Sequence, residues 1–173
     1  MKALLRILLI SFMLSPLLLN AQEHNNDGYS VNLRLGAIRP FNYLMGLHFS
    51  PELCVYRDQK IYSAEYSFIQ DFVIFGEEDY ILNKISFCYG KYWGQNWYQY
   101  QVQAGLGPLW GKRMISEQYF SFFTPGAFLK AGIKLIPFKF AAIAADVQLN
   151  LNMEVPNAMV MVGIDLGKLA NQE

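Results

Sequence analysis

The sequence predicts an all-β protein, an eight-stranded antiparallel up-and-down transmembrane β-barrel, from three observations. Eight segments alternate between apolar and polar residues, as a strand does when successive side chains point to opposite faces. In all eight, the apolar face carries no charged residue. Charged residues make up only 16% of the chain and aromatic residues another 16%, whereas roughly 25% of residues are charged in ordinary soluble domains.

The chain begins with a segment typical of a secretory signal peptide. Lys2 and Arg6 precede an apolar run that ends near the small residue Ala21. An anchoring helix is the alternative, but Ser and Pro interrupt the run, which is shorter than the roughly 20 apolar residues that a spanning helix needs. We therefore expect residues 1–21 to be a cleaved signal peptide and residues 22–173 to form a single barrel domain in an exported protein.

The eight predicted strands have lengths close to the roughly 9–11 residues that a strand needs to cross a bilayer. They are 29–38, 43–56, 61–69, 80–90, 97–107, 127–136, 140–151 and 157–166.

The first four segments alternate, and Pro51 and Asn83 stand out within them. Pro51 cannot donate a ladder hydrogen bond, which predicts a bulge or an early end to the second strand. Asn83 is a polar residue on an otherwise apolar face. The apolar residues are Tyr29, Val31, Leu33, Leu35 and Ala37; Tyr43, Met45, Leu47, Phe49, Leu53 and Val55; Tyr62, Ala64, Tyr66 and Phe68; and Ile81, Ile85, Phe87 and Tyr89.

The last four segments also alternate, and 97–107 does so most clearly. In segment 97–107, three glutamines and two glycines lie opposite the apolar residues. The apolar residues of these segments are Tyr98, Tyr100, Val102, Ala104 and Leu106; Ala127, Leu129, Ala131, Ile133 and Leu135; Ala141, Ile143, Ala145, Val147, Leu149 and Leu151; and Ala158, Val160, Val162, Ile164 and Leu166.

Every charged residue of the eight segments falls on the polar face, which we expect to line the lumen. A Lys or Arg facing lipid at mid-membrane costs roughly 2–4 kcal/mol, which explains a charge-free outer face. The predicted interior polar network is Arg34, His48, Glu52, Glu65, Lys84, Gln99, Gln101, Gln103, Lys130, Lys134, Asp146 and Asp165. Because its four cations match its four anions, we expect them to pair and plug the barrel. A small pore for solutes is the alternative.

A soluble lipocalin-like periplasmic binding barrel would place the apolar face inside, around a ligand. It would then expose Gly, Ala, Gln and Asn to water with few charges, whereas soluble surfaces carry many more Lys and Glu. The membrane interpretation is therefore favoured.

The connections differ in length. Residues 57–60, 91–97 and 136–140 are short and alternate with longer connections at 70–79 and 108–126. Short periplasmic turns and longer external loops are typical of outer-membrane barrels. Aromatic residues at the strand ends suit interfacial girdles: Tyr29, Tyr43, Tyr62, Tyr89, Trp97 and Tyr98.

The two cysteines, Cys54 and Cys88, lie on predicted strands separated by a third strand. Strands are about 4.8 Å apart, so next-nearest strands exceed the usual reach of a disulfide. Two free thiols are expected.

In size, strand number and alternation, the mature chain resembles the small eight-stranded outer-membrane barrels, such as outer membrane protein X and the membrane domain of outer membrane protein A. The LNAQ cleavage region resembles that of small barrel proteins of the Bacteroidota. The resemblance implies a monomer in the outer membrane, surrounded by lipid.

Some barrels of this size modify lipids, and His48, Ser50 and Glu52 share one inner face. Alternate residues of a strand lie about 6.6–6.8 Å apart, too far for the successive hydrogen bonds of a catalytic triad. We expect no catalytic residues. The acidic run 77–79 (Glu77, Glu78, Asp79) matches no calcium motif, so we expect no metal and no cofactor.

The function is expected to reside in loop 108–126, a structural, adhesion or partner-binding element. Loops longer than roughly 12–15 residues are usually functional or disordered, and disordered segments are poor in aromatics. The candidate binding residues are Trp110, Lys112, Arg113, Tyr119, Phe120, Phe122 and Phe123. They suit a protein partner, a glycan or a lipid head group, and the balanced charge of the chain excludes a nucleic-acid partner. Alternatively, YFSFF extends a strand above the membrane or folds back on the rim.

Overall fold

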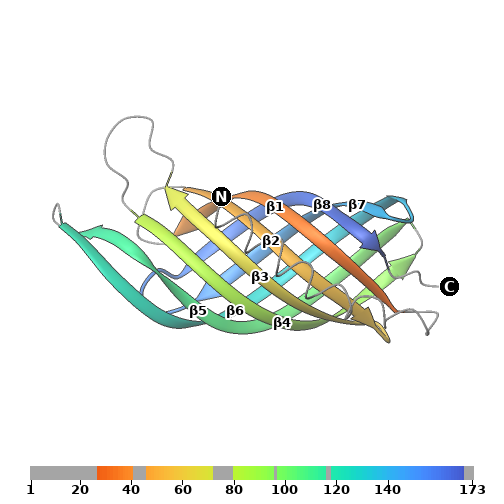
Figure 1. Ribbon diagram of the computed structural model, residues 1–173, viewed down its shortest axis with the longest axis horizontal. Helices are drawn as coiled ribbons and strands as arrows, with labels where there is room; N and C mark the ends of the chain where they lie inside the picture. Colours follow the sequence, from red (N-terminus) through yellow and green to blue (C-terminus); the bar gives the residue numbers. More distant parts are fainter. Residues whose placement is uncertain (1–26, 41–45, 72–79, 96, 116–117, 170–173) are drawn as a thin grey trace, which may run out of the picture.

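In the computed structural model, the described residues (27–40, 46–71, 80–95, 97–115 and 118–169) form a closed antiparallel barrel (Figure 1). Each strand pairs with the next, and β8 pairs with β1. The strands are β1 (Gly28–Pro40), β2 (Gly46–Arg57), β3 (Lys60–Asp71), β4 (Tyr80–Gln95), β5 (Tyr98–Ile115), β6 (Gln118–Phe138), β7 (Ala141–Leu151) and β8 (Asn157–Lys168). The eight-stranded up-and-down fold is thereby confirmed. The predicted signal peptide, 1–21, lies outside the described residues, in which no helix has the length and apolarity to span a membrane.

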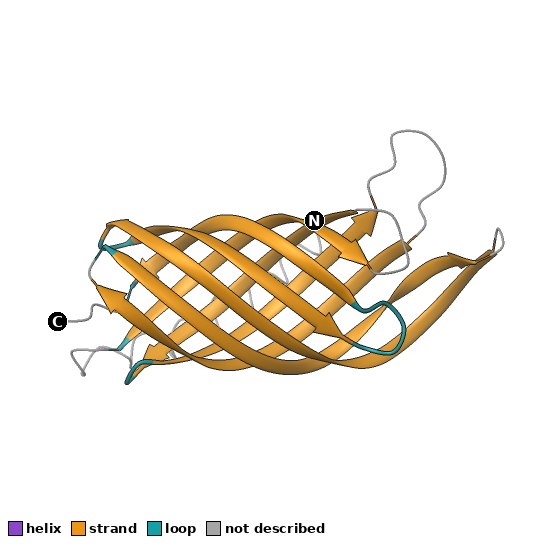
Figure 2. Ribbon diagram, turned by 180° about the vertical axis from the view of Figure 1, so that it is seen from behind, coloured by secondary structure: helices purple, strands orange, loops and turns teal. Residues whose placement is uncertain are grey.

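The two ends of the barrel differ. At one end, here called the turn end, β1 begins beside the end of β8, where Tyr29 pairs with Lys168. The connections β2–β3, β4–β5 and β6–β7 also lie at the turn end. At the other end, here called the outer end, β5 and β6 extend beyond the neighbouring strands (Figures 1 and 2).

A tight turn joins β2 to β3. Arg57 pairs with Lys60, and the two residues between them, Asp58 and Gln59, have φ angles of 49° and 64°. Positive φ at both central positions is the signature of a type I′ turn, whose twist matches that of paired strands. This turn fixes the register of β2 against β3.

The apolar face points outward and the polar face lines the lumen. Leu35, Phe87 and Val160 are 62%, 66% and 61% exposed on the outer wall. By contrast, Asn32 and Glu52 are at most 1% exposed. The predicted orientation is therefore confirmed, and the soluble alternative, with apolar side chains around an internal ligand, is wrong for this chain.

The prediction that Pro51 bulges or ends the second strand is wrong. β2 continues through Pro51 without a bulge: Phe49 pairs with Phe68 and Glu52 with Glu65, which is the same register on both sides of the proline. The register instead shifts between Leu135 and Phe138 on β6. β2 is hydrogen-bonded to a neighbouring strand on each side, so the strand continues although Pro51 lacks a backbone N–H donor.

Aromatic rings gather on the outer wall at the turn end, as predicted for an interfacial girdle. The rings of Tyr62 and Tyr89 lie 5.3 Å apart between centroids, and those of Trp97 and Tyr98 lie 4.5 Å apart. Tyr43 lies outside the described residues. The polar exception Asn83 is also accounted for, because the Tyr66 hydroxyl donates a 2.6 Å hydrogen bond to its side-chain oxygen.

Candidate functional site

The inward side chains form a buried polar network with balanced charge. Its eight charged residues in the described chain come from every strand except β5, and each is at most 2% exposed. Each of them takes part in at least one ion pair. They are Arg34, Glu52, Glu65, Lys84, Lys130, Lys134, Asp146 and Asp165. The structure thus places all of the charged residues predicted for the lumen there.

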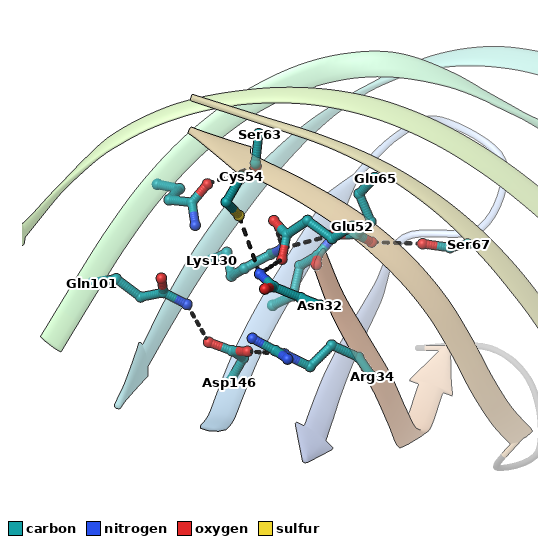
Figure 3. Close-up of polar contacts among 12 residues, drawn as sticks. Asn32, Arg34, Glu52, Cys54, Ser63, Glu65, Ser67, Gln101, Lys130 and Asp146 are labelled. Atoms are coloured by element: carbon teal, nitrogen blue, oxygen red, sulfur yellow. Dashed lines mark hydrogen bonds and ion pairs between the residues drawn. The ribbon is translucent and has the colours of Figure 1, made fainter. Parts of the chain in front are cut away.

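One group of ion pairs alternates acid and base across the lumen. The Nζ of Lys130 lies 2.7 Å from Glu52 and 2.6 Å from Glu65. Lys84 approaches the second oxygen of Glu65 at 2.8 Å. The Ser67 hydroxyl donates to that same oxygen at 2.6 Å (Figure 3). Because each buried charge faces an opposite one, the attraction between them offsets part of the cost of removing these groups from water.

A second group connects β1, β7 and β8 to β6. The Nε of Arg34 lies 2.6 Å from Asp146, and its Nη1 contacts Asp165. Lys134 lies 2.6 Å from the other oxygen of Asp165 and donates a 2.6 Å hydrogen bond to the Tyr56 hydroxyl. Gly132 faces Asp146, and a Cβ at that position would collide with its carboxylate. The glycine therefore leaves room for the acid.

The glutamines of β5 supply amides where the other strands supply charges. Gln101 donates to Asp146 at 2.7 Å (Figure 3), and Gln103 accepts from the Ser63 hydroxyl at 2.8 Å. Gln99 is buried as well. Asn32 has the same parity as Arg34 on β1, is absent from the predicted network, and donates to Glu52 at 3.1 Å. The sequence offered one signal that Asn32 belongs to the network, which is its short polar side chain on the polar face of the first segment.

Apolar clusters that the sequence did not predict lie at both ends of the lumen. At the outer end Phe122 packs against a cluster of Ile38, Ile69, Tyr80, Leu82, Val155, Met159 and Met161. At the turn end the cluster is Cys54, Tyr56, Ile61 and Tyr92. Except for Val155, which lies between β7 and β8, these apolar residues occupy inward positions near the strand ends, where alternation predicts polar ones. The lumen is thus filled by ion pairs at its middle and by apolar side chains at its ends.

The His48, Ser50 and Glu52 set does not form a catalytic triad. All three are buried on the inner face. Within the described part of the chain, neither ring nitrogen of His48 nor the Ser50 hydroxyl has a hydrogen-bond partner, and Glu52 pairs with Lys130. His48 is therefore not bonded into the polar network that was predicted to include it.

No group of three or more His, Cys, Asp or Glu residues in the described ranges is placed to hold a metal ion. The acidic run 77–79 lies outside those ranges. Cys54 and Cys88 are free and buried, and each is the cross-strand partner of Ser63 on the strand between them.

The prediction of an external loop over 108–126 is wrong. β5 and β6 continue through this segment and pair as far as Ile115 with Gln118, so that it forms a protruding β-hairpin (Figure 2). The alternative, that YFSFF extends a strand, is confirmed. Gly107 pairs with Gly126 and Pro108 with Pro125, so residues typical of loops face one another across the ladder.

The hairpin divides the predicted binding residues between two faces. On the inward face, Arg113 lies 2.7 Å from the Glu154 carboxylate and stacks at 5.6 Å over the ring of Phe122, which packs on the outer-end cluster. The ion pair ties the hairpin to the connection between β7 and β8. Phe120, the cross-strand partner of Arg113, lies on the same face as Arg113 but is 48% exposed. On the opposite face, Tyr119 is 48% exposed and Phe123 is 72% exposed. Trp110 is half-buried, and Lys112 is exposed.

Comparison with known proteins identifies the fold. No family model matches the sequence, and no curated protein matches it. Solved structures that are similar include Neisserial surface protein A (TM-score 0.66, 9% identity, covering 83% of this chain and 97% of that one). Ail of Yersinia pestis has a TM-score of 0.60 at 14% identity, covering 83% and 99%. The N-terminal barrel domain of Pseudomonas aeruginosa OprF has a TM-score of 0.59 at 15% identity, covering 80% and 96%.

At these identities the likeness shows the fold alone. The chain has the fold of the small eight-stranded outer-membrane barrels, which is the fold that the resemblance in its sequence implied.

Proposed function

We propose that this chain is a non-catalytic outer-membrane barrel, exported by its signal peptide, that binds a partner through the β5–β6 hairpin. The apolar outer wall supports the location, because large apolar side chains such as Phe87 and Leu106 are exposed around a charged, filled lumen. The hairpin carries the binding role. It projects at the outer end with Tyr119, Phe120 and Phe123 exposed on a paired two-stranded scaffold.

The chemistry of the hairpin favours a protein surface as the partner. Large aromatic rings bury much apolar area at a contact and lose little conformational entropy. A structure of Ail in complex with the heparin analogue sucrose octasulfate is similar in fold. In this chain, however, Arg113 is paired with Glu154, which leaves Lys112 as the hairpin's exposed cation. The exposed aromatic rings on the two faces of the hairpin therefore support a protein partner better than a sulfated glycan.

A trimmed hairpin tests the binding role. Because Gly111 pairs with Phe122, replacing residues 112–121 with Asn-Gly closes the hairpin with a two-residue turn and keeps Phe122 on its cluster. We expect the trimmed barrel to reach the outer membrane and keep its heat-modifiable gel mobility. Cells that display it should lose adherence to protein-coated surfaces, compared with cells that display the full chain.

The double variant Phe120→Ser/Phe123→Ser is a milder test. Its control is Leu47→Ser, at a 55% exposed position on β2, away from the hairpin. Equal adherence of the full-length and trimmed proteins would contradict the binding role. Recovery of the protein in the soluble periplasmic fraction without detergent would contradict the location.

A further inference from the structure

We infer that the outer wall of β1–β4 binds an anionic phospholipid of the leaflet at the turn end. A row of cations would hold the phosphate, and an apolar hollow beside it would hold an acyl chain. This inference rests on the membrane location proposed above and adds a specific ligand to it.

Three cations lie side by side on adjacent strands. Arg57 on β2 is the cross-strand partner of Lys60 on β3, and Lys60 is the partner of Lys91 on β4. All three side chains are exposed. Like charges directly opposite one another in a sheet repel, so an anion that lies between these side chains would relieve the repulsion.

The nearby acids neutralise the row only weakly. Asp58 lies 3.8 Å from the Arg57 guanidinium, with the two side chains 70% and 64% exposed. Exposed pairs of this kind contribute little. Over the described residues, the turn end carries the cations Arg57, Lys60, Lys91, Lys139 and Lys168 against the acids Asp27 and Asp58. This end of the barrel therefore attracts anions.

The row lies at the level of a lipid head group. Lys60 and Lys91 are each two residues from a ring of the aromatic girdle, Tyr62 and Tyr89, and alternation puts them on the same outward face. Tyr and Trp rings mark the boundary between head groups and hydrocarbon, and basic residues just beyond that boundary attract anionic lipids.

An apolar hollow of about 550 Å³ lies on the membrane side of this girdle. At its centre is Ala64, a small residue between two larger cross-strand partners, Leu53 on β2 and Phe87 on β4. The other outward residues that line it are Tyr29, Val31, Val55 and Tyr62. A short side chain flanked by long ones makes a recess in the wall, which suits a hydrocarbon chain.

The spacing of the two features fits one lipid molecule. Lys60 and Ala64 are four residues apart on β3, about 14 Å along the strand at roughly 3.4 Å per residue. A phosphate at the row would thus have its acyl chain at the depth of the hollow. A zwitterionic lipid would bring its own ammonium group to the cations, so the row favours a lipid whose net charge is negative.

Native mass spectrometry of the refolded mature barrel in detergent tests this inference. Dioleoyl phosphatidylglycerol is titrated against dioleoyl phosphatidylcholine, which has the same acyl chains. We expect a retained 1:1 phosphatidylglycerol adduct, weakened about 30-fold in Lys60→Gln/Lys91→Gln, because each basic residue near an anionic lipid contributes about fivefold. The control, Arg39→Gln/Lys139→Gln, removes the same charge from exposed positions outside the row and should retain the adduct.

A second variant, Ala64→Phe, fills the hollow and leaves the cations in place, and it should weaken the adduct as well. Equal retention of the two lipids would overturn the inference. So would equal losses in the row and control variants, or a dimer mass that excludes lipid and shows that a second copy covers the wall. Soluble periplasmic protein in cell fractionation would instead contradict the proposed location, whatever binds in detergent.

Discussion

Lys130 on β6 lies between two carboxylates from the facing wall of the barrel, 2.7 Å from Glu52 and 2.6 Å from Glu65. All three side chains are at most 2% exposed. The ion pairs therefore join β6 to β2 and β3 through the lumen, in addition to the hydrogen bonds that run around the wall.

Substitution of Lys130 with Met should destabilise the barrel strongly. The change leaves Glu52 without its charged partner and Glu65 with Lys84 as its remaining one, and removing one partner of a buried ion pair costs about 3–5 kcal/mol. Urea titration of the barrel refolded into phosphatidylcholine vesicles measures the difference. Lys112→Met, at an exposed position, is the control, and a similar stability for the two variants would show that the inner pairs contribute little.

The barrel should not conduct. Ion pairs fill the middle of the lumen, and clusters containing Phe122 at the outer end and Tyr56 at the turn end close it. Reconstitution into planar bilayers should give no steady current at a protein density where a general porin, as positive control, gives clear steps. Stable unitary openings would instead favour the small-pore alternative.

A charged residue on the outer wall should lower the free energy of unfolding more, the closer it lies to the middle of the membrane. Val162 lies at the middle of β8 and is 59% exposed, whereas Leu166 lies on the same face two residues from the turn end of that strand. Val162→Arg should reduce the free energy of unfolding in vesicles by about 2–4 kcal/mol, and Leu166→Arg by about 0–1 kcal/mol. If the two variants unfold at the same urea concentration, this wall does not face hydrocarbon.

Both thiols should stay reduced and react slowly in the folded barrel. Cys54 and Cys88 are 2% and 6% exposed, and Ser63 on β3 separates them. A maleimide mass tag should add two labels after denaturation but few before it, and gels with and without reductant should match. A reductant-sensitive mobility shift of the monomer would reveal an intramolecular disulfide and contradict the register described here.

The sequence alone determined which side chains face outward and which face the lumen. Side chains of a strand alternate with a period of two, so neighbours such as Arg34 and Leu35 must face opposite sides. The face that carries no charged residue is then identified as the outward one. The eight strands, the outward apolar wall and the inner charges followed from this one regularity.

Only the tertiary structure decided which inner residues meet. Arg34 and Asp146 are 112 positions apart, and closure of the barrel brings them to 2.6 Å. The hairpin is a similar case. The Gly and Pro residues of 105–111 and 125–126 predict a loop when each is considered alone, but Pro108 and Pro125 lie opposite one another and the ladder continues past them. Whether a segment forms a paired strand depends on its partner strand, and that partner cannot be identified from the segment's own sequence.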